Sequence, residues 1–302
     1  MALDLDTRQR TPLPSDEVRV LTPPDVARLR PGWQNRLRGD ELRQLLVAYP
    51  ERSVWLPGSR EYVVVAPWRH RDEVASIQEL VAVRQAETLL AALVERCRAA
   101  GDALVLMMEI DEVRPPGFYA RAGFDLIEEV VTYEMERVAP VRDQGPLRFR
   151  RADPADRATL AELERIDHAA FPWLWWNSAD EFAAYSRTPG VELFIGRQDE
   201  RAVSYVGLTT YLGWGHLDRI AVDPAVQGQG YGRSSLAFAV NRLAAQGARR
   251  IGLSTQRENR RSQRMYERFG FRRTRGNDYR LYGVALREPD DGRRATEAGD
   301  AS

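Results

Sequence analysis

The sequence contains no lysine: all 44 of its basic side chains are arginines. Lysine is needed by the phosphate loop of P-loop nucleotide-binding proteins and by enzymes that form a Schiff base, including those that use pyridoxal phosphate. Both classes are therefore excluded. Acidic residues also number 44, so the formal net charge is zero and gives no reason to expect nucleic acid or an anionic membrane as a partner.

Cysteine and histidine are scarce. The single cysteine, Cys97, has no partner for an internal disulfide, and the three histidines share no metal-ligand spacing with it, so we expect no metal. No apolar run approaches the ~20 residues of a membrane helix, and the first residues lack the apolar core of a signal peptide. We therefore expect a cytoplasmic protein without a membrane partner.

At 302 residues the chain is long enough for two ordinary domains, and part of it is repeated. Residues 118–124 (FYARAGF) return 147 positions later as residues 265–271 (MYERFGF). A helix-like stretch and a short apolar strand-like run precede each copy. We predict a mixed α/β fold made of two copies of one unit, each flanked by helices. The predicted boundaries are a disordered segment 1–16, a first unit 17–141, a linker 142–146, a second unit 147–286 and a disordered segment 287–302.

Three glycines at alternate positions mark the second unit, in the run QGQGYG at residues 227–232. The run lies between a strand-like segment, Leu217–Val222, and a helix-like stretch that starts near Arg233. Glycines let the backbone approach a ligand closely, and the helix N-terminus behind them offers unpaired N–H groups. This arrangement is typical of a phosphate site. It is not the dinucleotide fingerprint, because Arg233 occupies the place of the required third glycine.

The corresponding part of the first unit differs. If Glu79–Val83 is matched to Arg219–Asp223, the first unit then runs straight into its helix through a shorter segment without glycine. The position matched to Asn259 is acidic or apolar, at Glu112 or Val113. A short segment without glycine is unsuited to wrapping a diphosphate, so we expect only the second unit to bind a cofactor.

The glycine run, Asn259 and the motif around Tyr266 together resemble the GNAT superfamily of acyl-CoA-dependent N-acyltransferases. The resemblance implies a mostly antiparallel twisted sheet in each unit, with two parallel central strands that splay apart around the pantetheine arm of acetyl-CoA or another acyl-CoA. It implies cofactor contacts from the following residues: Ile220, Ala221, Val222, Gln227, Gly228, Gln229, Gly230, Tyr231, Gly232, Arg233, Asn259, Ser262 and Tyr266.

The implied reaction is attack of an amine on a thioester, which requires a base, an oxyanion donor and a proton for the departing sulfur. Tyr266 matches the general-acid tyrosine of the family, and a phenol is protonated at neutral pH. The glutamate that some members carry on the second splayed strand is replaced here by Ser254. The base is therefore left open between Asp218 and His216, which lie on one face of the first splayed strand, with Glu258 and an ordered water as further alternatives.

Aromatic residues gather where the amine acceptor is expected to bind. We predict an apolar or stacking wall made by Phe171, Trp173, Trp175, Trp176, Tyr205 and Tyr211. The expected activity is N-acetylation of a primary amine on a small molecule or peptide, in a ternary complex with acetyl-CoA. The alternative is a non-catalytic acyl-CoA-binding regulator or scaffold. Because the two units share one chain, we expect a monomer, with a weak homodimer as the other possibility.

Overall fold

The computed structural model describes residues 17–29, 37–110, 114–115, 117–142, 145–274 and 276–287. The predicted disordered segment 1–16 lies outside the described residues, and so does the segment predicted at 287–302 except for Arg287. Glu112 and Val113, which were matched to Asn259, and residues 143–144 of the predicted linker also lie outside them.

The N-terminal half consists of β1 (Arg19–Val20), η2 (Pro23–Arg28), α1 (Gly39–Ala48), β2 (Val54–Leu56), β3 (Glu61–Trp68), β4 (Arg71–Val81), α2 (Ala86–Ala99), β5 (Leu104–Glu109), α3 (Phe118–Arg121) and β6 (Asp125–Met135). The C-terminal half consists of β7 (Arg148–Arg151), α4 (Arg157–Ala170), η3 (Trp173–Trp175), α5 (Ala179–Arg187), β8 (Val191–Gln198), β9 (Arg201–Tyr211), β10 (Trp214–Val222), η4 (Pro224–Val226), α6 (Tyr231–Ala245), β11 (Arg250–Gln256), α7 (Arg260–Arg268), β12 (Arg272–Arg273) and β13 (Tyr279–Ala285). The η elements are 3₁₀ helices.

Within the described residues, 13 strands form one sheet, in the order β1-β2-β3-β4-β5-β13-β6-β11-β10-β9-β8-β7, with β12 paired to β6. Two pairs are parallel in this part of the chain, β4 with β5 and β10 with β11, and the other pairs are antiparallel. The predicted mixed α/β fold with a mostly antiparallel sheet is confirmed.

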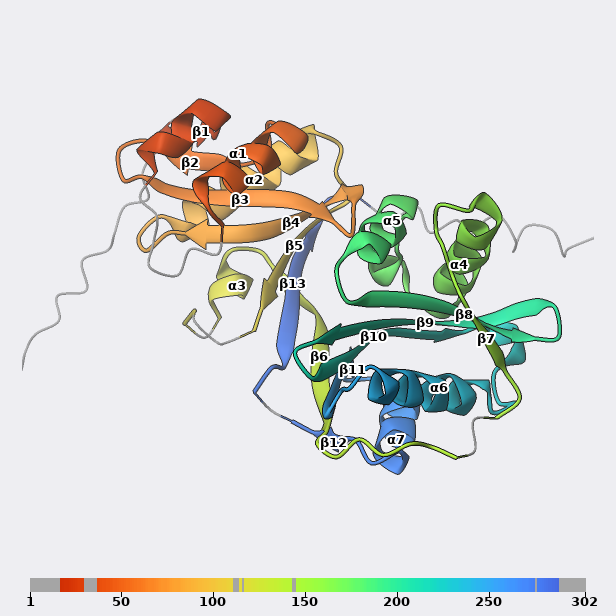
Figure 1. Ribbon diagram of the computed structural model, residues 1–302. Coiled ribbons are helices and arrows are strands. Elements are labelled where there is room, and N and C mark those ends of the chain that lie inside the picture. The colour runs from red at the N-terminus through yellow and green to blue at the C-terminus, as the bar shows by residue number, and fades with distance from the viewer. Residues whose placement is uncertain are drawn as a thin grey trace, which may run out of the picture.

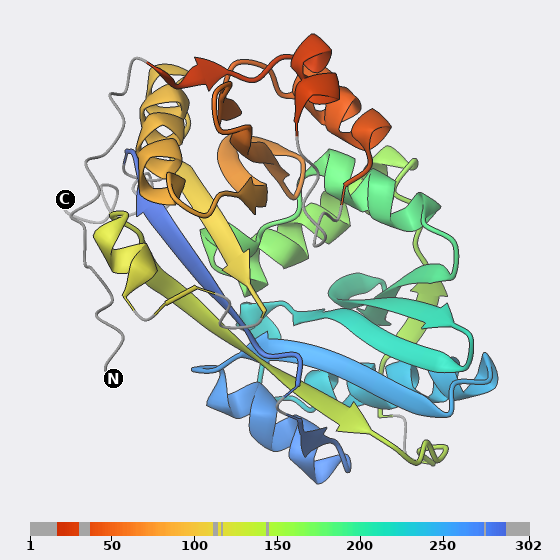
Figure 2. The ribbon, with the colours of Figure 1, turned by 90° about the vertical axis from the view of Figure 1, so that its left-hand side faces the viewer.

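The two halves exchange their last strands. β13, from the C-terminal end, lies between β5 and β6 (Figure 1), and Figure 2 shows it running alongside both. β6, from the N-terminal half, pairs with β11 over Val130–Met135. The boundary predicted at 142–146 therefore separates the helices of the two units but not their strands, because each sheet is completed by a strand from the other side of that boundary.

Helices cover both faces of the C-terminal half, with α6 and α7 on one face and α4 and α5 on the other (Figure 1). Leu236, Val240 and Leu243 of α6 are buried against β9, β10 and β11. Leu163 of α4 and Phe182 of α5 are buried against β8 and β9. These two cores hold β10 and β11 rigidly between the helix layers, which fixes the frame of the site described below.

The tryptophan-rich segment forms part of the contact between the halves. Trp175 packs edge-on against Trp68 of β3 at 5.8 Å between ring centroids, and both belong to a cluster with Val74, Leu104 and Leu106 of the N-terminal half. Simple core packing therefore accounts for much of this aromatic cluster. No helix among the described residues is long and apolar enough to cross a bilayer.

Candidate active site

The site begins where the two parallel strands of the C-terminal half separate. β10 and β11 pair only from Trp214 to Leu217 and from Arg250 to Leu253, although β10 continues to Val222. An irregularity in the β9 pairing between Leu217 and Arg219 falls at the same point. Beyond it the two strands diverge, so one edge of β10 is open toward the gap between them.

A cleft of about 1040 Å³ lies at the open end of these strands. Gly228 and Gly230 form part of its wall with φ angles of +89° and +83°, and an added Cβ at either position would have no heavy atom within 4 Å. Gly230 is the N-cap of α6, so the first-turn N–H groups of this helix face the loop. The loop conformation therefore exposes backbone N–H groups to the cleft, as an anion site requires.

Arginines surround the same cleft. Arg233, Arg261, Arg264 and Arg268 all line it, and Arg261 Nη1 donates a hydrogen bond of 2.6 Å to Oε1 of Gln227. Asn259 caps α7 by accepting a hydrogen bond from the N–H of Ser262 at 3.2 Å. A strand edge, a glycine loop and four guanidinium groups match the amides, diphosphate and further phosphate of an acyl-CoA.

A smaller cavity of about 320 Å³ lies beside the splay. Five residues line both hollows, which therefore meet at the point where the strands separate: Phe171, Ile220, Gln256, Asn259 and Ser262. Tyr266 lines the smaller cavity and is 4% exposed. Burial raises the pKa of Tyr266 to about 12, although a hydrogen bond with Ser262 lowers it in part. The phenol is therefore protonated throughout the neutral range.

His216 and Asp218 also line the smaller cavity, and His216 Nδ1 lies 2.7 Å from Oδ1 of Asp218. The other carboxylate oxygen of Asp218 accepts hydrogen bonds from the hydroxyls of Tyr185 at 2.5 Å and Thr209 at 2.6 Å. Asp218 thus has little acceptor capacity left. The imidazole ring lies beside Gly252 of β11, where a side chain would crowd it. The arrangement suits Asp218 to orient His216, and His216 to accept a proton at Nε2.

The structure brings most of the predicted cofactor residues together, and places two of them elsewhere. Gln229 is exposed and does not line the cleft, and Tyr231 is buried against Leu147 and Val203 in a small core. The remaining predicted cofactor residues line the cleft or the adjoining cavity: Ile220, Ala221, Val222, Gln227, Gly228, Gly230, Gly232, Arg233, Asn259, Ser262 and Tyr266.

The predicted acceptor wall is reduced to Phe171 and Trp175, which line the smaller cavity. Tyr205 is fully buried and donates a hydrogen bond to Asp167, while Tyr211 is 71% exposed at the end of β9. These positions are corrections to the prediction, because β9 turns its tyrosines into the core and into solvent.

The other two tryptophans of the predicted wall also lie away from both cavities. The guanidinium carbon of Arg71 lies 4.3 Å from the ring centroid of Trp173. The rings of Trp176 and His168 are stacked, with 4.5 Å between their centroids. Trp173 therefore contacts β4 of the N-terminal half, and Trp176 contacts α4.

Several lining residues come from the exchanged strands and the N-terminal half, which the sequence patterns did not indicate. Arg69, Val130 and Tyr279 line the smaller cavity, and Glu128 of β6 lines the larger cleft. Burial raises the pKa of Glu128, and contact with the indole of Trp175 lowers it in part. None of these residues lies in a motif that the sequence patterns marked, so the fold was needed to find them.

The N-terminal half repeats the splay but fills it with its own side chains. β4 and β5 pair only up to Ile77 and Met107, and α2 begins five residues after β4 ends. Glu61 Oε1 accepts hydrogen bonds from the N–H groups of Val83 and Arg84, both at 3.1 Å. An internal carboxylate therefore occupies the position that corresponds to the glycine loop ahead of α6.

The strand edge of this first splay is blocked as well. Arg114 donates hydrogen bonds of 2.9 Å to the carbonyl oxygens of Leu80 and Ala82, and its guanidinium lies over the ring of Phe118. These carbonyls correspond to the strand edge that is open in β10. Tyr119, which matches Tyr266 in the repeat, is buried in the core of this half.

Comparison with known proteins shows what part of the chain is similar to. Residues 158–271 match the Acetyltransferase (GNAT) family. The [ribosomal protein bS18]-alanine N-acetyltransferase of Haemophilus ducreyi is 31% identical over 74 residues, which cover 24% of this chain and 51% of that protein. The chain thus matches about half the length of this curated relative.

Two solved structures share the fold across both halves. A GCN5-related N-acetyltransferase from Sphaerobacter thermophilus superposes with a TM-score of 0.55 at 16% identity, over 89% of this chain and 95% of that one. A tandem GNAT protein from the clavulanic acid biosynthesis pathway superposes with a TM-score of 0.51 at 12% identity, over 76% of this chain and 80% of that one. The segment that contains the splayed strands β10 and β11 and the glycine loop, residues 158–271, is thus the part of the chain that matches the GNAT acetyltransferase family.

Proposed function

We propose that this chain is an N-acetyltransferase that transfers the acetyl group of acetyl-CoA to a primary amine of a small molecule or peptide, within a ternary complex. The observation that carries this proposal is the meeting of two hollows at the splay between β10 and β11. One hollow has the features of an acyl-CoA site. The other contains Tyr266 and His216, which are suited to move protons.

Acetyl-CoA supplies a thioester, whose carbonyl carbon is open to attack by an amine. In the proposed arrangement the backbone of Ile220–Val222 pairs with the pantetheine arm as an added strand. The N–H groups of the loop from Gln227 to Gly232 hold the diphosphate, and a backbone N–H near Val222 faces the developing oxyanion.

The two proton transfers are assigned to the smaller cavity. His216, oriented by Asp218, takes the proton that the amine loses, and its partly exposed ring can release it to solvent. Tyr266 donates a proton toward the sulfur. Because burial raises its pKa to about 12, it retains its proton at neutral pH until a thiolate develops nearby.

The alternative is an acyl-CoA-binding regulator or scaffold without turnover, and it is motivated by Ser254, which lines the smaller cavity where some relatives carry a glutamate. Calorimetric titration with acetyl-CoA, followed by a free-thiol assay with a panel of amines, separates the two. Binding with thiol release supports the enzyme. Binding without release across the panel supports the scaffold, and absence of binding contradicts both.

A further inference from the structure

The turn between β3 and β4 carries an arginine of the N-terminal half into the smaller cavity. Arg69 and His70 adopt positive φ angles of 54° and 53°, which form a tight turn. The turn is fastened to the C-terminal half by three contacts. Ser178 donates a hydrogen bond of 3.0 Å to the carbonyl of Arg69, His70 Nδ1 lies 2.7 Å from Glu181 Oε2, and Arg69 Nε donates to Asn177 Oδ1 at 2.8 Å. The guanidinium is therefore held in a fixed place in the cavity wall.

Most charged side chains of this cavity already have an ionic partner. Arg219 is paired with Asp167, and two carboxylates of the cavity, Asp218 and Glu181, each contact a histidine. In addition, the guanidinium of Arg219 is 3.9 Å from the ring centroid of Phe171 and donates to the carbonyl of Trp175. These groups are thus committed to the protein itself.

Arg69 is different, because no carboxylate among the described residues forms a salt bridge with it. Its Nε and Nη2 both donate to the neutral amide oxygen of Asn177, and no acceptor in this part of the chain takes its Nη1. Burial and the nearby Arg219 lower the pKa of Arg69 to about 10, and the attraction of Glu181 does not offset them. A partly buried cation without a carboxylate partner is well placed to bind an anionic group of a ligand.

We infer that the amine acceptor is a small molecule or peptide end that carries a carboxylate, and that Arg69 binds this carboxylate while the amine lies toward His216 and Tyr266. The inference rests on the proposed function. Guanidinium groups match carboxylates closely in shape and charge. Tyr279 of β13 also lines the cavity. The charge of Arg69 lowers the pKa of Tyr279 in part, so the two groups are near each other, and the phenol is a second hydrogen-bond donor for a carboxylate. A cavity of about 320 Å³ suits an acceptor of amino-acid size.

The test compares matched acceptors. Twenty amino acids and the corresponding amino-acid amides would be assayed for thiol release with acetyl-CoA. Binding of the N-acetylated acids and amides would be measured by calorimetry in the presence of CoA, which needs no turnover. For at least one pair we expect the acid to be preferred over the amide by about 10- to 100-fold, the usual worth of a hydrogen-bonded ionic contact.

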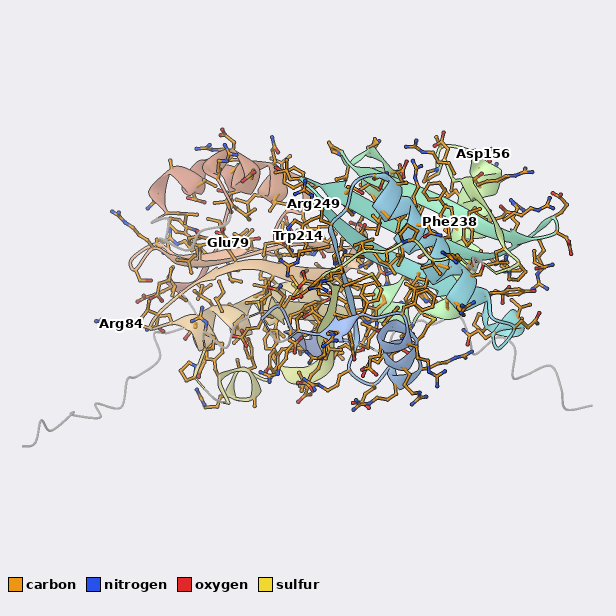
Figure 3. All side chains as sticks on the ribbon, turned by 60° about the horizontal axis from the view of Figure 1, so that its bottom comes forward. Glu79, Arg84, Asp156, Trp214, Phe238 and Arg249 are labelled. Carbon is orange, nitrogen blue, oxygen red and sulfur yellow. The ribbon has the colours of Figure 1, made fainter. Side chains whose placement is uncertain are left out.

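The variants separate recognition from structural support. Arg69→Gln should remove the preference for acids by raising their KM while amides change little, and Arg69→Lys should retain part of it. Arg84→Gln is the matched control, because Arg84 is exposed at the edge of the N-terminal half (Figure 3) and does not line the cavity. Its acid-to-amide ratio should equal that of the wild type.

Three results would overturn the inference. The first is equal turnover and equal binding of all acids and amides by the wild type, which leaves the proposed function intact if thiol is released. The second is an Arg69→Gln variant whose activity falls by the same factor with acids and with amides, because Arg69 would then only support the structure. The third is full retention of the preference in Arg69→Gln. Failure to bind acetyl-CoA would instead contradict the proposed function.

Discussion

Glu61 Oε2 accepts a hydrogen bond of 3.0 Å from the backbone N–H of Gln85, the residue that caps α2. The same carboxylate accepts hydrogen bonds from the backbone N–H groups of Val83 and Arg84. In the C-terminal half the equivalent stretch is the glycine loop ahead of α6. One half thus carries its own anion at a helix N-terminus, and the other leaves that place for a ligand.

This difference predicts the stoichiometry of binding. Because Glu61 and Arg114 fill the first splay, we expect one acetyl-CoA per chain. Calorimetric titration of the full chain gives this number directly. A value near two would show that the N-terminal half opens to admit a second nucleotide.

Gly230→Asp should abolish acetyl-CoA binding while leaving the fold intact, because it places a negative charge at the start of α6. Gly247 provides a matched control at the other end of this helix, with a φ angle of +85° and open space around its α-carbon. Gly247→Asp should lose a similar amount of folding stability, because both glycines have a positive φ angle, but it should bind acetyl-CoA with unchanged affinity. Calorimetry and thermal melts of both variants check the prediction, and similar affinities in the two would contradict the assignment of the loop.

Tyr266→Phe should lower turnover by about 10²-fold or more with nearly unchanged acetyl-CoA affinity, the usual effect of removing a general acid. Tyr133→Phe is the control. The ring centroids of Tyr133 and Tyr266 are 6.2 Å apart, but the hydroxyl of Tyr133 donates a hydrogen bond to Glu267, and Tyr133 lines neither cavity. Thiol release under saturating acetyl-CoA measures the effect. Full activity of Tyr266→Phe would assign the proton donor elsewhere.

The raised pKa of Tyr266 also predicts how the stability of the fold changes with pH. The phenol loses its proton near pH 10 in the unfolded chain and near 12 in the folded one. Its contribution to stability is therefore complete below pH 10 and is lost as the pH rises through 12. Urea unfolding between pH 8 and 11 should show a smaller alkaline loss in Tyr266→Phe than in the wild type. An equal loss would mean that the phenol is more solvated than its burial indicates.

His216→Gln should lower turnover by about 10²-fold, because glutamine preserves a polar contact with Asp218 but takes no proton at neutral pH. Asp218→Asn should have a smaller effect, since it leaves the imidazole in place and alters only its orientation. Steady-state rates at fixed pH compare the two. If Asp218→Asn is the more damaging change, the roles of the two residues are reversed.

The local parts of the site could be predicted from the sequence. The glycine run, the helix behind it and the neighbouring strands depend on residues close together in the chain, and β10, α6, β11 and α7 lie where these patterns indicated. Most of the predicted cofactor residues line the cleft for this reason.

The parts that depend on distant pairings could not be predicted. Nothing in the residues of β13 specifies β5 rather than β11 as a neighbour, because an alternating apolar strand fits either edge. The role of Arg69 depends on this assembly too, since its turn meets the C-terminal half only after the sheet is formed. The tryptophans were misplaced for a related reason: a large aromatic ring suits an interface between halves as well as a ligand wall.

The exchange of β6 and β13 has a consequence for how the molecule can be divided. A fragment that ends at the predicted linker retains β6 but loses the neighbour that separates it from β5, and the complementary fragment leaves β11 with a bare edge. Neither piece contains every strand of the sheet, but the two produced together in one cell have all of them, and we expect them to reassemble. The N-terminal half thus completes the sheet of the C-terminal half by supplying β6 as the neighbour of β11.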